Sequence, residues 1–560
     1  MSPNQTEALI QVTLEPMGSR VQVTPGSSLL ECAQAAGVEI NAVCGGNGTC
    51  GMCKVILMQG QVSPLEPVER DLLDPTEIKK GLRLACQTRV LSDARAQFPP
   101  ESLASLQRLQ LEGQETHILP RPAVRWVDGE TRVVLNRKQI ISILPAGSVL
   151  VGYAVDIGTT KIAGYLVDLQ TGHTLASAGV TNPQIAFGED VISRIEYCDS
   201  HPQGGRELQR VLVDALNEQL EGLCQQAGVC LEQVVDSVMV GNTAMHHLLV
   251  SCPVHSLGTA PYEAAILSAM RIPAAEIGLQ MAPGASIYLP PNIAGFVGGD
   301  HVAMLLASRA TKFKQTVVAL DIGTNTEISL IHQGRHFACS CASGPAFEGA
   351  HIREGIRAIP GAIERVLLEG EEVQIHTVQG KPAIGICGSG ILDVVAELRQ
   401  AELIDRRGAF RKGSPRFSLR HGKLAFVLVP AQKSGHGREI SINRQDVNEI
   451  QLAKAAIRSG VEVLLREAGI NAEDIEIFLV AGAFGSYLDL RNAVRIGMFP
   501  SIPLNRYRQV GNAAGAGARQ MLISTRLRTS AEHLGDKIVY VELTTVSGYT
   551  DIFMDAIQLD

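Results

Sequence analysis

Four cysteines near the amino terminus have the type and spacing of a metal-cluster site. Cys44, Cys50 and Cys53 follow the pattern C-x5-C-x2-C within the glycine-rich segment CGGNGTCGMC, and Cys86 follows after 32 intervening residues in LACQTRV. An iron–sulfur cluster needs thiolates that converge on a small core, so a tight loop can supply three ligands and a distant segment the fourth. Glycines in such a loop permit turns that direct backbone N–H groups at the sulfurs. The pattern therefore predicts an iron–sulfur cluster held by these four thiolates.

A structural zinc site is the alternative interpretation of the same cysteines. Zinc sites favour paired C-x2-C arms, and only one such pair is present, at Cys50 and Cys53. The loop spacing is one residue longer than the plant-type pattern and resembles that of adrenodoxin-type 2Fe-2S ferredoxins. The other eight of the twelve cysteines are scattered, which does not suggest a disulfide framework. We expect Cys339, Cys341 and Cys387 to be core thiols rather than ligands of a second cluster.

The phrase DIGT occurs twice, at Asp156 and at Asp321, and each copy follows an apolar strand and precedes a second strand. The repetition in matching contexts indicates an internal duplication. Backbone amides and hydroxyls in such turns suit a phosphate chain, and the carboxylate suits a hydrated Mg²⁺. Ordinary strand connections stabilised by Asp are the alternative. The predicted ATP and Mg²⁺ site comprises Asp156, Gly158, Thr159, Thr160, Lys161, Asp321, Gly323, Thr324 and Asn325.

Two glycine-rich segments extend this prediction. Gly388, Ser389 and Gly390 precede a helical pattern, so their N–H groups are candidates for contact with nucleotide phosphate, although a plain helix start explains them too. Gly482 and Ala483 follow an apolar strand in LVAGAFGS, where a purine and ribose could lie close to the backbone.

Asp190 and Glu327 are candidate catalytic residues that would orient the attacking water, with a solvated carboxylate as the equal alternative for each. Neither a P-loop nor a Rossmann glycine motif is present. The two DIGT turns together with LVAGAFGS resemble the superfamily of actin, sugar kinases and heat-shock-chaperone ATPases.

The element pattern places these motifs in separate domains. Residues 8–23 read as two strands around a turn and residues 28–36 as a helix, which is how an α+β β-grasp ferredoxin domain begins. Alternating strands and helices after residue 150 predict an α/β body of two lobes, actin-like with a duplicated ribonuclease H-like fold. The expected divisions are a 2Fe-2S ferredoxin-like domain at 1–96, a linker at 97–123, a small connector at 124–150, a first ATPase lobe at 151–315 and a second at 316–560.

Composition excludes several classes of function. The chain has 49 basic and 57 acidic side chains, a formal net charge of −8, so it offers no basic field for nucleic acid or an anionic membrane. The sequence has no apolar run of membrane-spanning length and does not begin with the pattern of a secretory signal. We expect a cytoplasmic protein that binds neither nucleic acid nor membrane.

The whole chain resembles the reductive activators of corrinoid proteins, in which a 2Fe-2S module is joined to an ATPase of this kind. Beyond the four cysteines and the two DIGT turns, the resemblance is carried by NPQIAFGEDVISRI, VGNTAMHHLL, SGPAFEGAHI, GICGSGILD and AGAFGSYLD. It implies ATP-dependent, one-electron reduction of inactive Co(II) corrinoid to Co(I), the state that accepts a methyl group. It also implies a corrinoid protein of a methyl-transfer system as partner, an upstream electron donor and a homodimer.

The implied reaction is thermodynamically uphill. Plant-type clusters have potentials near −400 mV, and Co(I) is the stronger reductant. A gap of a few hundred millivolts corresponds to about 5 kcal/mol for one electron, more than the ~1–3 kcal/mol of a typical allosteric coupling. This deficit explains why ATP would be needed. Nucleotide binding and hydrolysis would change the closure of the two lobes, and this closure would change how the ATPase body binds the corrinoid protein.

Three other functions stay open on the sequence. A small-molecule kinase would use the same ATP site, with the cluster as a regulator. An activator of 2-hydroxyacyl-CoA dehydratases has a similar body but a bridging 4Fe-4S cluster and no ferredoxin module, so Cys44 to Cys86 argue against it. A redox-sensing scaffold would bind nucleotide without turnover.

Overall fold

The computed structural model of the chain describes residues 9–560 apart from 16–18, 37, 39, 41–45, 47, 49–52, 74, 100–101, 103–117, 128–131, 136–138, 189, 350, 412, 421, 483 and 486. The chain forms two compact units. The first comprises residues 1–107 together with 181–211, and the second comprises residues 108–180 together with 212–560. Most of the predicted linker, 97–123, lies outside the described residues.

The amino-terminal part of the first unit is a five-stranded sheet in the order β2-β1-β5-β3-β4. The central strand pair is parallel, whereas β1 runs antiparallel to β2, so the sheet is mixed as in a β-grasp fold. Helix α1 (Leu29–Ala35) begins at a capping box formed by Ser28 and Glu31 and buries its apolar face on the sheet. The strands are β1 (Ile10–Glu15), β2 (Ser19–Val23), β3 (Lys54–Gln59), β4 (Leu82–Leu84) and β5 (Ala94–Gln97).

The acidic segment between β3 and β4 forms two short helices. Helix α2 (Pro67–Leu72) ends before Pro75, which begins α3 (Pro75–Lys79). A proline lacks the N–H needed to continue a helix and restricts the residue before it, so it separates the two. The first unit also contains α4 (Val191–Ser200) and the start of α5 (Gly204–Ala227).

The second unit contains two six-stranded sheets of matching topology. Their orders are β11-β10-β9-β12-β14-β13 and β25-β24-β15-β16-β17-β26. In each sheet the DIGT strand pairs antiparallel with the next strand and parallel with a later one. The predicted duplication is therefore confirmed. The first sheet has β9 (Val151–Ile157), β10 (Lys161–Asp168), β11 (Thr174–Thr181), β12 (Val234–Gly241), β13 (Met270–Pro273) and β14 (Ser286–Leu289). The second has β15 (Val317–Ile322), β16 (Thr326–His332), β17 (Arg335–Cys341), β24 (Ile477–Ala481), β25 (Tyr507–Gly511) and β26 (Ile538–Tyr540).

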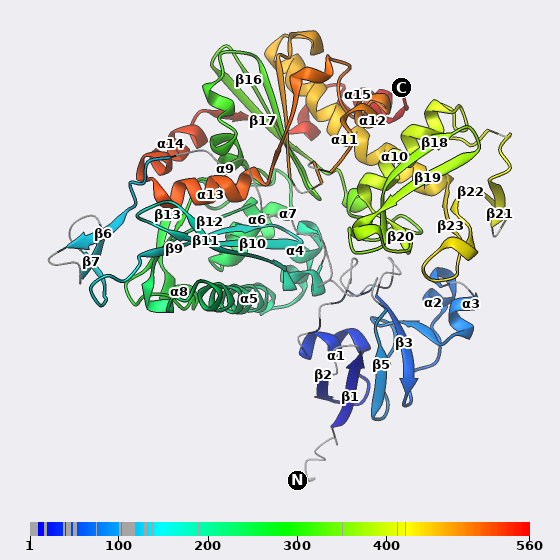
Figure 1. Ribbon diagram of the computed structural model, residues 1–560, viewed down its shortest axis with the longest axis horizontal. Coiled ribbons are helices and arrows are strands. Elements are labelled where there is room, and N and C mark those ends of the chain that lie inside the picture. Colours follow the sequence, from blue (N-terminus) through cyan, green and yellow to red (C-terminus); the bar gives the residue numbers. More distant parts are fainter. Residues whose placement is uncertain are drawn as a thin grey trace. The chain divides into compact units, whose positions relative to one another are not determined.

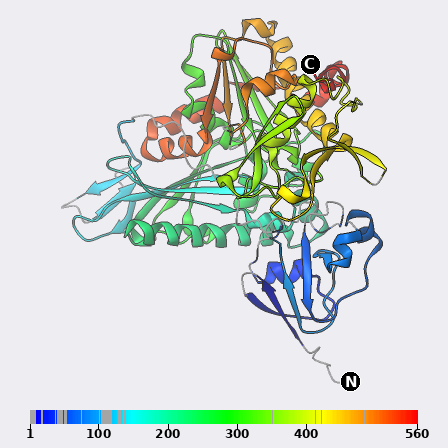
Figure 2. The same cartoon turned by 45° about the vertical axis from the view of Figure 1, so that its right-hand side comes forward.

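Helices cover both faces of the first sheet. Helix α5 lies along one face, where Tyr153 donates to Gln219 at 2.6 Å, and α13 lies on the opposite face (Figures 1 and 2). Helix α13 (Ala513–Ile523) follows the second sheet in the chain and packs against β9, β12 and α9 (Gly299–Ala307). The carboxyl-terminal part of the chain therefore contributes to the packing of the first sheet.

Smaller elements complete the second unit. Three further sheets have three strands each, in the orders β6-β7-β8, β19-β18-β20 and β21-β22-β23. Their strands are β6 (Val124–Val127), β7 (Arg132–Leu135), β8 (Gln139–Ile143), β18 (Ala362–Glu369), β19 (Glu372–Thr377), β20 (Gly385–Ile386), β21 (Phe417–Arg420), β22 (Lys423–Val429) and β23 (Ile440–Asn443). The remaining helices are α6 (Thr243–Leu249), α7 (His255–Gly258), α8 (Ala274–Ile277), α10 (Gly388–Gln400), α11 (Arg444–Ala468), α12 (Leu490–Arg495), α14 (Thr525–Gly535) and α15 (Tyr549–Ile557).

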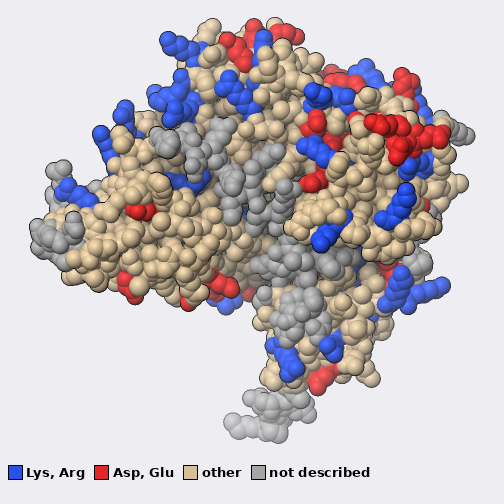
Figure 3. Space-filling view, in the orientation of Figure 1, with Lys and Arg blue, Asp and Glu red and all other residues tan. Residues whose placement is uncertain are grey.

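Basic and acidic side chains are interspersed on the molecular face shown in Figure 3. Within the described part of the chain, no helix combines the length and apolar character needed to cross a membrane.

A buried ion pair joins α14 to the first sheet. Asp236 of β12 is fully buried and accepts from Arg528 at 2.6 Å and from Arg271 at 3.2 Å. The Arg528 guanidinium also lies 5.0 Å from the centre of the Tyr288 ring. If Arg528 moved away, Asp236 would stay buried with one fewer cationic partner, which is energetically unfavourable. The ion pair therefore stabilises the packing of the carboxyl-terminal segment on the first sheet.

Replacing Arg528 with Ala is expected to lower the free energy of unfolding by about 3 kcal/mol, because Asp236 then keeps only Arg271. Chemical denaturation measures this loss. Arg526→Ala, at an exposed position on the same helix, is the matched control and should change stability by less than about 0.5 kcal/mol. Equal losses in the two variants would contradict the role given to the buried pair.

Candidate functional site

Two of the four predicted cluster ligands are described, and they lie side by side. The sulfurs of Cys53 and Cys86 are 3.4 Å apart, close enough to bind one metal atom. Cys53 immediately precedes β3, and its carbonyl accepts from the Ala85 N–H at 2.8 Å. This backbone bond fixes the segment that carries Cys86 next to the start of β3. Cys44 and Cys50 lie outside the described residues.

The surroundings of this sulfur pair suit a cluster. Gly46 and Gly48 have φ angles of 93° and 74°, the left-handed region that glycine adopts readily. The amide of Gln87 donates to the Gly46 carbonyl at 3.1 Å and lies 3.5 Å from the Cys86 sulfur. Donors near a thiolate stabilise its charge and tune a cluster's potential. Within the described part of the chain, no three His, Cys, Asp or Glu side chains are arranged to hold a metal ion.

Buried Glu69 supports the Cys86 segment from α2. Its carboxylate accepts from Arg83 at 2.7 Å and from the Leu84 N–H at 2.9 Å. The side chains of the cysteines predicted to be core thiols, Cys339, Cys341 and Cys387, are buried. Burial raises the pKa of each of these three thiols, which disfavours the thiolate needed for ligation.

Four carboxylates gather where the strands of the duplicated turns end. Asp156 and Asp321 are the penultimate residues of β9 and β15, Glu327 lies on β16, and Asp300 lies in the first turn of α9. Burial raises the pKa of Asp156 to about 6, and burial together with the charge of Asp156 raises the pKa of Asp321 to about 7. Such mutual repulsion is relieved when a cation binds, so this cluster is suited to a metal-bound nucleotide.

Asp300 was missed by the sequence analysis. Burial, followed by the charges of Asp321 and Asp156, raises the pKa of Asp300 well above its usual value. Burial, followed by Asp300 and Asp321, does the same for the pKa of Glu327. The segment FVGGDHV at the start of α9 contains the signal, a carboxylate after two glycines, but only the fold reveals its proximity to the DIGT aspartates.

Two asparagines that cap helices hold the first DIGT turn. Asn512 caps α13 and donates to the Asp156 carboxylate at 3.0 Å. Asn242 caps α6 and donates to the Thr159 hydroxyl at 3.0 Å. Each side chain uses its oxygen for the cap and its amide for the turn, so two helix starts are anchored at the candidate site. Gly158 forms the turn itself, and Thr160 is buried.

Lys161 links the two halves of the site electrostatically. Burial lowers the pKa of Lys161 to about 8, while nearby Glu348 raises it and Arg357 lowers it. Glu348 also accepts from the Thr324 hydroxyl in the second turn at 2.8 Å. The predicted residues of both turns therefore lie near one another.

The second DIGT turn is closed by its own backbone and by a buried serine. The Gly323 N–H donates to the Asn325 carbonyl at 3.1 Å, and the Ser343 hydroxyl lies 2.9 Å from that of Thr326. Gly482 is left-handed, at φ 89°, and a Cβ there would lie 2.8 Å from an Asp321 carboxylate oxygen. Only glycine allows this approach, which brings the predicted purine segment beside Asp321. Ala483 lies outside the described residues.

The GSG segment has a clear packing role. A Cβ on Gly388 would lie 1.7 Å from the Phe347 carbonyl, and one on Gly390 would lie 2.2 Å from the Ile363 carbonyl. Ser389 is buried and donates to the Glu364 carbonyl at 3.0 Å. These glycines let α10 start tightly against Phe347 and β18, and their contact with nucleotide phosphate stays a prediction.

The two candidate catalytic carboxylates have different surroundings. Asp190 caps α4 and accepts from the backbone and hydroxyl of Ser193 at 2.7 and 2.9 Å. This local role accounts for Asp190, and its orientation of water stays a prediction. Glu327 belongs to the carboxylate cluster, where burial and the charges of Asp300 and Asp321 raise its pKa, and its role in orienting water also stays a prediction.

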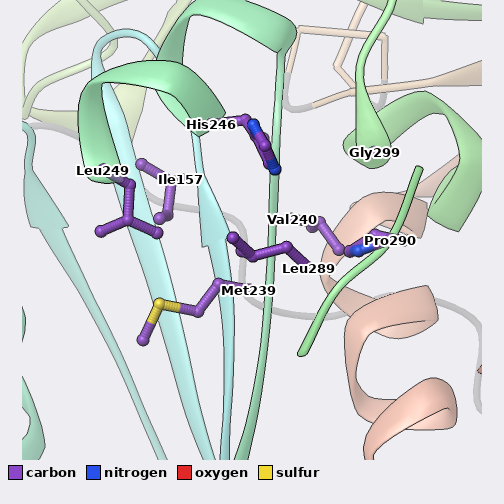
Figure 4. Close-up of a pocket in the computed structure, with 9 residues that line it drawn as sticks. Ile157, Met239, Val240, His246, Leu249, Leu289, Pro290 and Gly299 are labelled. Atoms are coloured by element: carbon purple, nitrogen blue, oxygen red, sulfur yellow. The ribbon is translucent and has the colours of Figure 1, made fainter. Parts of the chain in front are cut away.

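A small apolar cavity lies next to this site in the first lobe. Ile157, Gly241 and Gly299 contribute to its lining, and His246 of α6 points into it (Figure 4). His246 is buried, its Nε2 has no hydrogen-bond partner, and burial lowers its pKa to about 3. The neutral imidazole of His246 therefore contributes to the apolar packing next to the first DIGT turn.

Comparisons with known proteins agree with this architecture. Residues 12–91 match a 2Fe-2S iron–sulfur cluster binding domain, 151–312 the RACo middle region, and 315–560 the C-terminal domain of RACo, the ASKHA domain. Corrinoid activation enzyme RamQ of Eubacterium limosum is 30% identical over 97% of this chain and 98% of its own length. The Co(II) methylated amine-specific corrinoid protein reductase of Methanosarcina barkeri is 27% identical over 71% of this chain and 75% of its own.

A solved structure gives the same result. The reductive activator for corrinoid, iron-sulfur protein superposes with a TM-score of 0.72 at 31% identity and covers 98% of both chains. Fold and site together define an iron–sulfur protein with a duplicated, actin-like ATPase body. The chain belongs to the family of reductive activators of corrinoid proteins.

Replacing Asp321 with Asn is expected to raise the melting temperature of the protein when nucleotide and divalent cation are absent. A carboxyl whose folded pKa is raised to about 7 from 3.8 costs stability as pH rises through this interval, by up to ~1.4 kcal/mol per pH unit. The gain of the variant over the wild type should therefore grow between about pH 5 and 7 and level off above. Thermal melting across this range measures it.

Asp214→Asn, at an exposed position on α5, is the control for this experiment. The control should show no such growth. A pH-independent difference between Asp321→Asn and the wild type would contradict the electrostatic description of the carboxylate cluster.

Proposed function

We propose that this chain is an ATP-dependent reductase that transfers one electron from its 2Fe-2S cluster to a corrinoid protein, converting Co(II) to Co(I) for methyl transfer. The observation that carries the proposal is the presence on one chain of a paired-thiol loop and a buried carboxylate cluster, in the domain order of the corrinoid activators. Reduction of Co(II) to Co(I) by an ordinary cluster is thermodynamically unfavourable, so phosphoanhydride cleavage would supply the missing free energy.

The second unit supplies the residues for nucleotide. The amides of the two DIGT turns and the Lys161 ammonium would hold the phosphates, and the backbone at Gly482, which lies beside Asp321, would lie close to the purine. Bound Mg²⁺ would neutralise the carboxylates Asp156, Asp300 and Asp321. Glu327, within the same cluster, would accept a proton from the attacking water.

The first unit supplies the electron carrier. Cys53 and Cys86, with the predicted ligands Cys44 and Cys50, would hold the cluster, and the Gln87 amide would stabilise its charge. The cluster supplies one-electron storage at low potential. We further propose a separate upstream electron donor, a homodimer and a cytoplasmic location. The eight described cysteines that are not predicted cluster ligands, none of them in a disulfide, suit a reducing compartment.

Co(I) formation on a corrinoid acceptor, such as the one used by the methylated-amine system, should depend on both halves of the chain. At fixed reductant, ATP should accelerate the change of the cobalt spectrum from Co(II) to Co(I). Cys86→Ser should abolish it by removing a cluster ligand, and Asp156→Asn should lower the ATP-dependent rate at least tenfold. The matched controls, Cys230→Ser and Asp214→Asn, change exposed side chains and should retain the wild-type rate.

The fate of the phosphate separates this function from a kinase. Hydrolysis should release inorganic phosphate at a rate that rises with the corrinoid protein. Transfer of phosphate to a small-molecule hydroxyl, or Co(I) formation that is indifferent to ATP, would contradict the proposal.

A further inference from the structure

A cavity of about 730 Å³ lies within the first unit and reaches one of the cluster thiols. Gln34, Gly46 and Cys86 line it from the ferredoxin domain, and Phe187, Tyr197 and His201 line it from the segment 181–211. The Gln34 amide donates to the Ala186 carbonyl at 2.7 Å, which ties the two walls together. Ligand pockets commonly have volumes of ~300–1,000 Å³, so the cavity has room for a small organic molecule.

One wall of the cavity is aromatic. The rings of Tyr197 and His201 are stacked with centres 4.1 Å apart, and Phe187 meets Tyr197 edge-on at 5.1 Å. The Tyr197 hydroxyl donates to the Glu207 carboxylate at 2.8 Å, which fixes the orientation of the ring. A preoriented aromatic group of this kind suits a planar, aromatic ligand.

The charges around the cavity favour a ligand without negative charge. Its lining contains three carboxylates, Glu31, Glu196 and Glu207, and one guanidinium, Arg89. Acidic side chains beside aromatic rings attract organic cations, which also interact favourably with the ring faces. An anionic molecule would meet repulsion at the same place.

We propose that this cavity is the electron-entry site for a planar aromatic one-electron donor that is neutral or cationic. The donor would pack against the aromatic wall that Tyr197, His201 and Phe187 form, lose one electron and leave in oxidised form, while the cluster gains that electron on its Cys86 side. No atom is transferred. The inference rests on the proposed function for the presence of the cluster, and it adds the chemical class of the donor and the place where it binds.

Reduction of the oxidised cluster by reduced methyl viologen, followed by visible absorbance in a stopped-flow instrument, tests the site. Tyr197→Ala should lower the second-order rate constant about 3- to 10-fold, as expected for the loss of one aromatic contact, whereas Tyr197→Phe should stay within about twofold. Glu196→Gln should lower it about twofold by removing an attractive charge. The matched control, Glu218→Gln, changes an exposed carboxylate elsewhere on α5 and should have no effect.

Two further measurements separate binding from a general loss of structure. Titanium(III) citrate, an anionic donor without an aromatic ring, should reduce the cluster equally fast in all variants. Calorimetric titration of oxidised methyl viologen into the protein with oxidised cluster should show binding that Tyr197→Ala weakens by a similar factor. Equal slowing with both donors, or unchanged viologen kinetics and binding in Tyr197→Ala and Glu196→Gln, would overturn the proposal.

Cluster reduction needs neither ATP nor a corrinoid protein, so its result is independent of the proposed function. If viologen reduces the cluster with the rates expected for the wild type and the variants, but no Co(I) forms, the corrinoid function is refuted and the entry site is not. Co(I) formation with unchanged kinetics in the Tyr197 and Glu196 variants would refute the entry site alone.

Discussion

The repulsion among buried carboxylates is the constraint on which the second unit depends. Asp156 and Asp321 end equivalent strands of two similar sheets, and Asp300 adds a third charge from the start of α9. Burial raises the pKa of all three, and the charges of neighbouring aspartates raise those of Asp300 and Asp321 further. Burying like charges together destabilises the folded protein, so stability does not explain this cluster. Nucleotide binding does, because a bound metal–nucleotide complex would neutralise the charges.

The elements around this cluster make it responsive to what it binds. Asn512 connects Asp156 to α13, Asn242 connects Thr159 to α6, and Lys161 interacts with Glu348, which also holds Thr324. A change at the site therefore acts on two helices, α13 and α6, and on both DIGT turns. This arrangement can convert nucleotide state into a change of packing, which is the physical requirement for coupling ATP to an uphill electron transfer.

Much of this organisation was predictable from sequence because it is encoded locally. The cysteine spacing, the glycine loop and the repeated DIGT each lie within a short segment, and the β-grasp and duplicated sheets follow from strand patterns around them. Asp300, Asn242 and Asn512 were not predictable, since topology alone brings Asp300 and Asn512 to Asp156 from 144 and 356 positions away along the chain, and Asn242 to Thr159 from 83. The GSG segment suggests phosphate binding from its sequence, and the structure adds a packing requirement at the start of α10 that the sequence does not show.

The most direct test of the central claim is the proton balance of nucleotide binding. Titration calorimetry of Mg·ADP into the protein, in buffers of different ionisation enthalpy, gives the number of protons released. Because the pKa values of Asp156 and Asp321 are raised to about 6 and 7, binding at pH 6 should release protons, and fewer protons should be released at pH 8. Binding that releases no proton at pH 6, or the same number at pH 6 and 8, would contradict the carboxylate clamp.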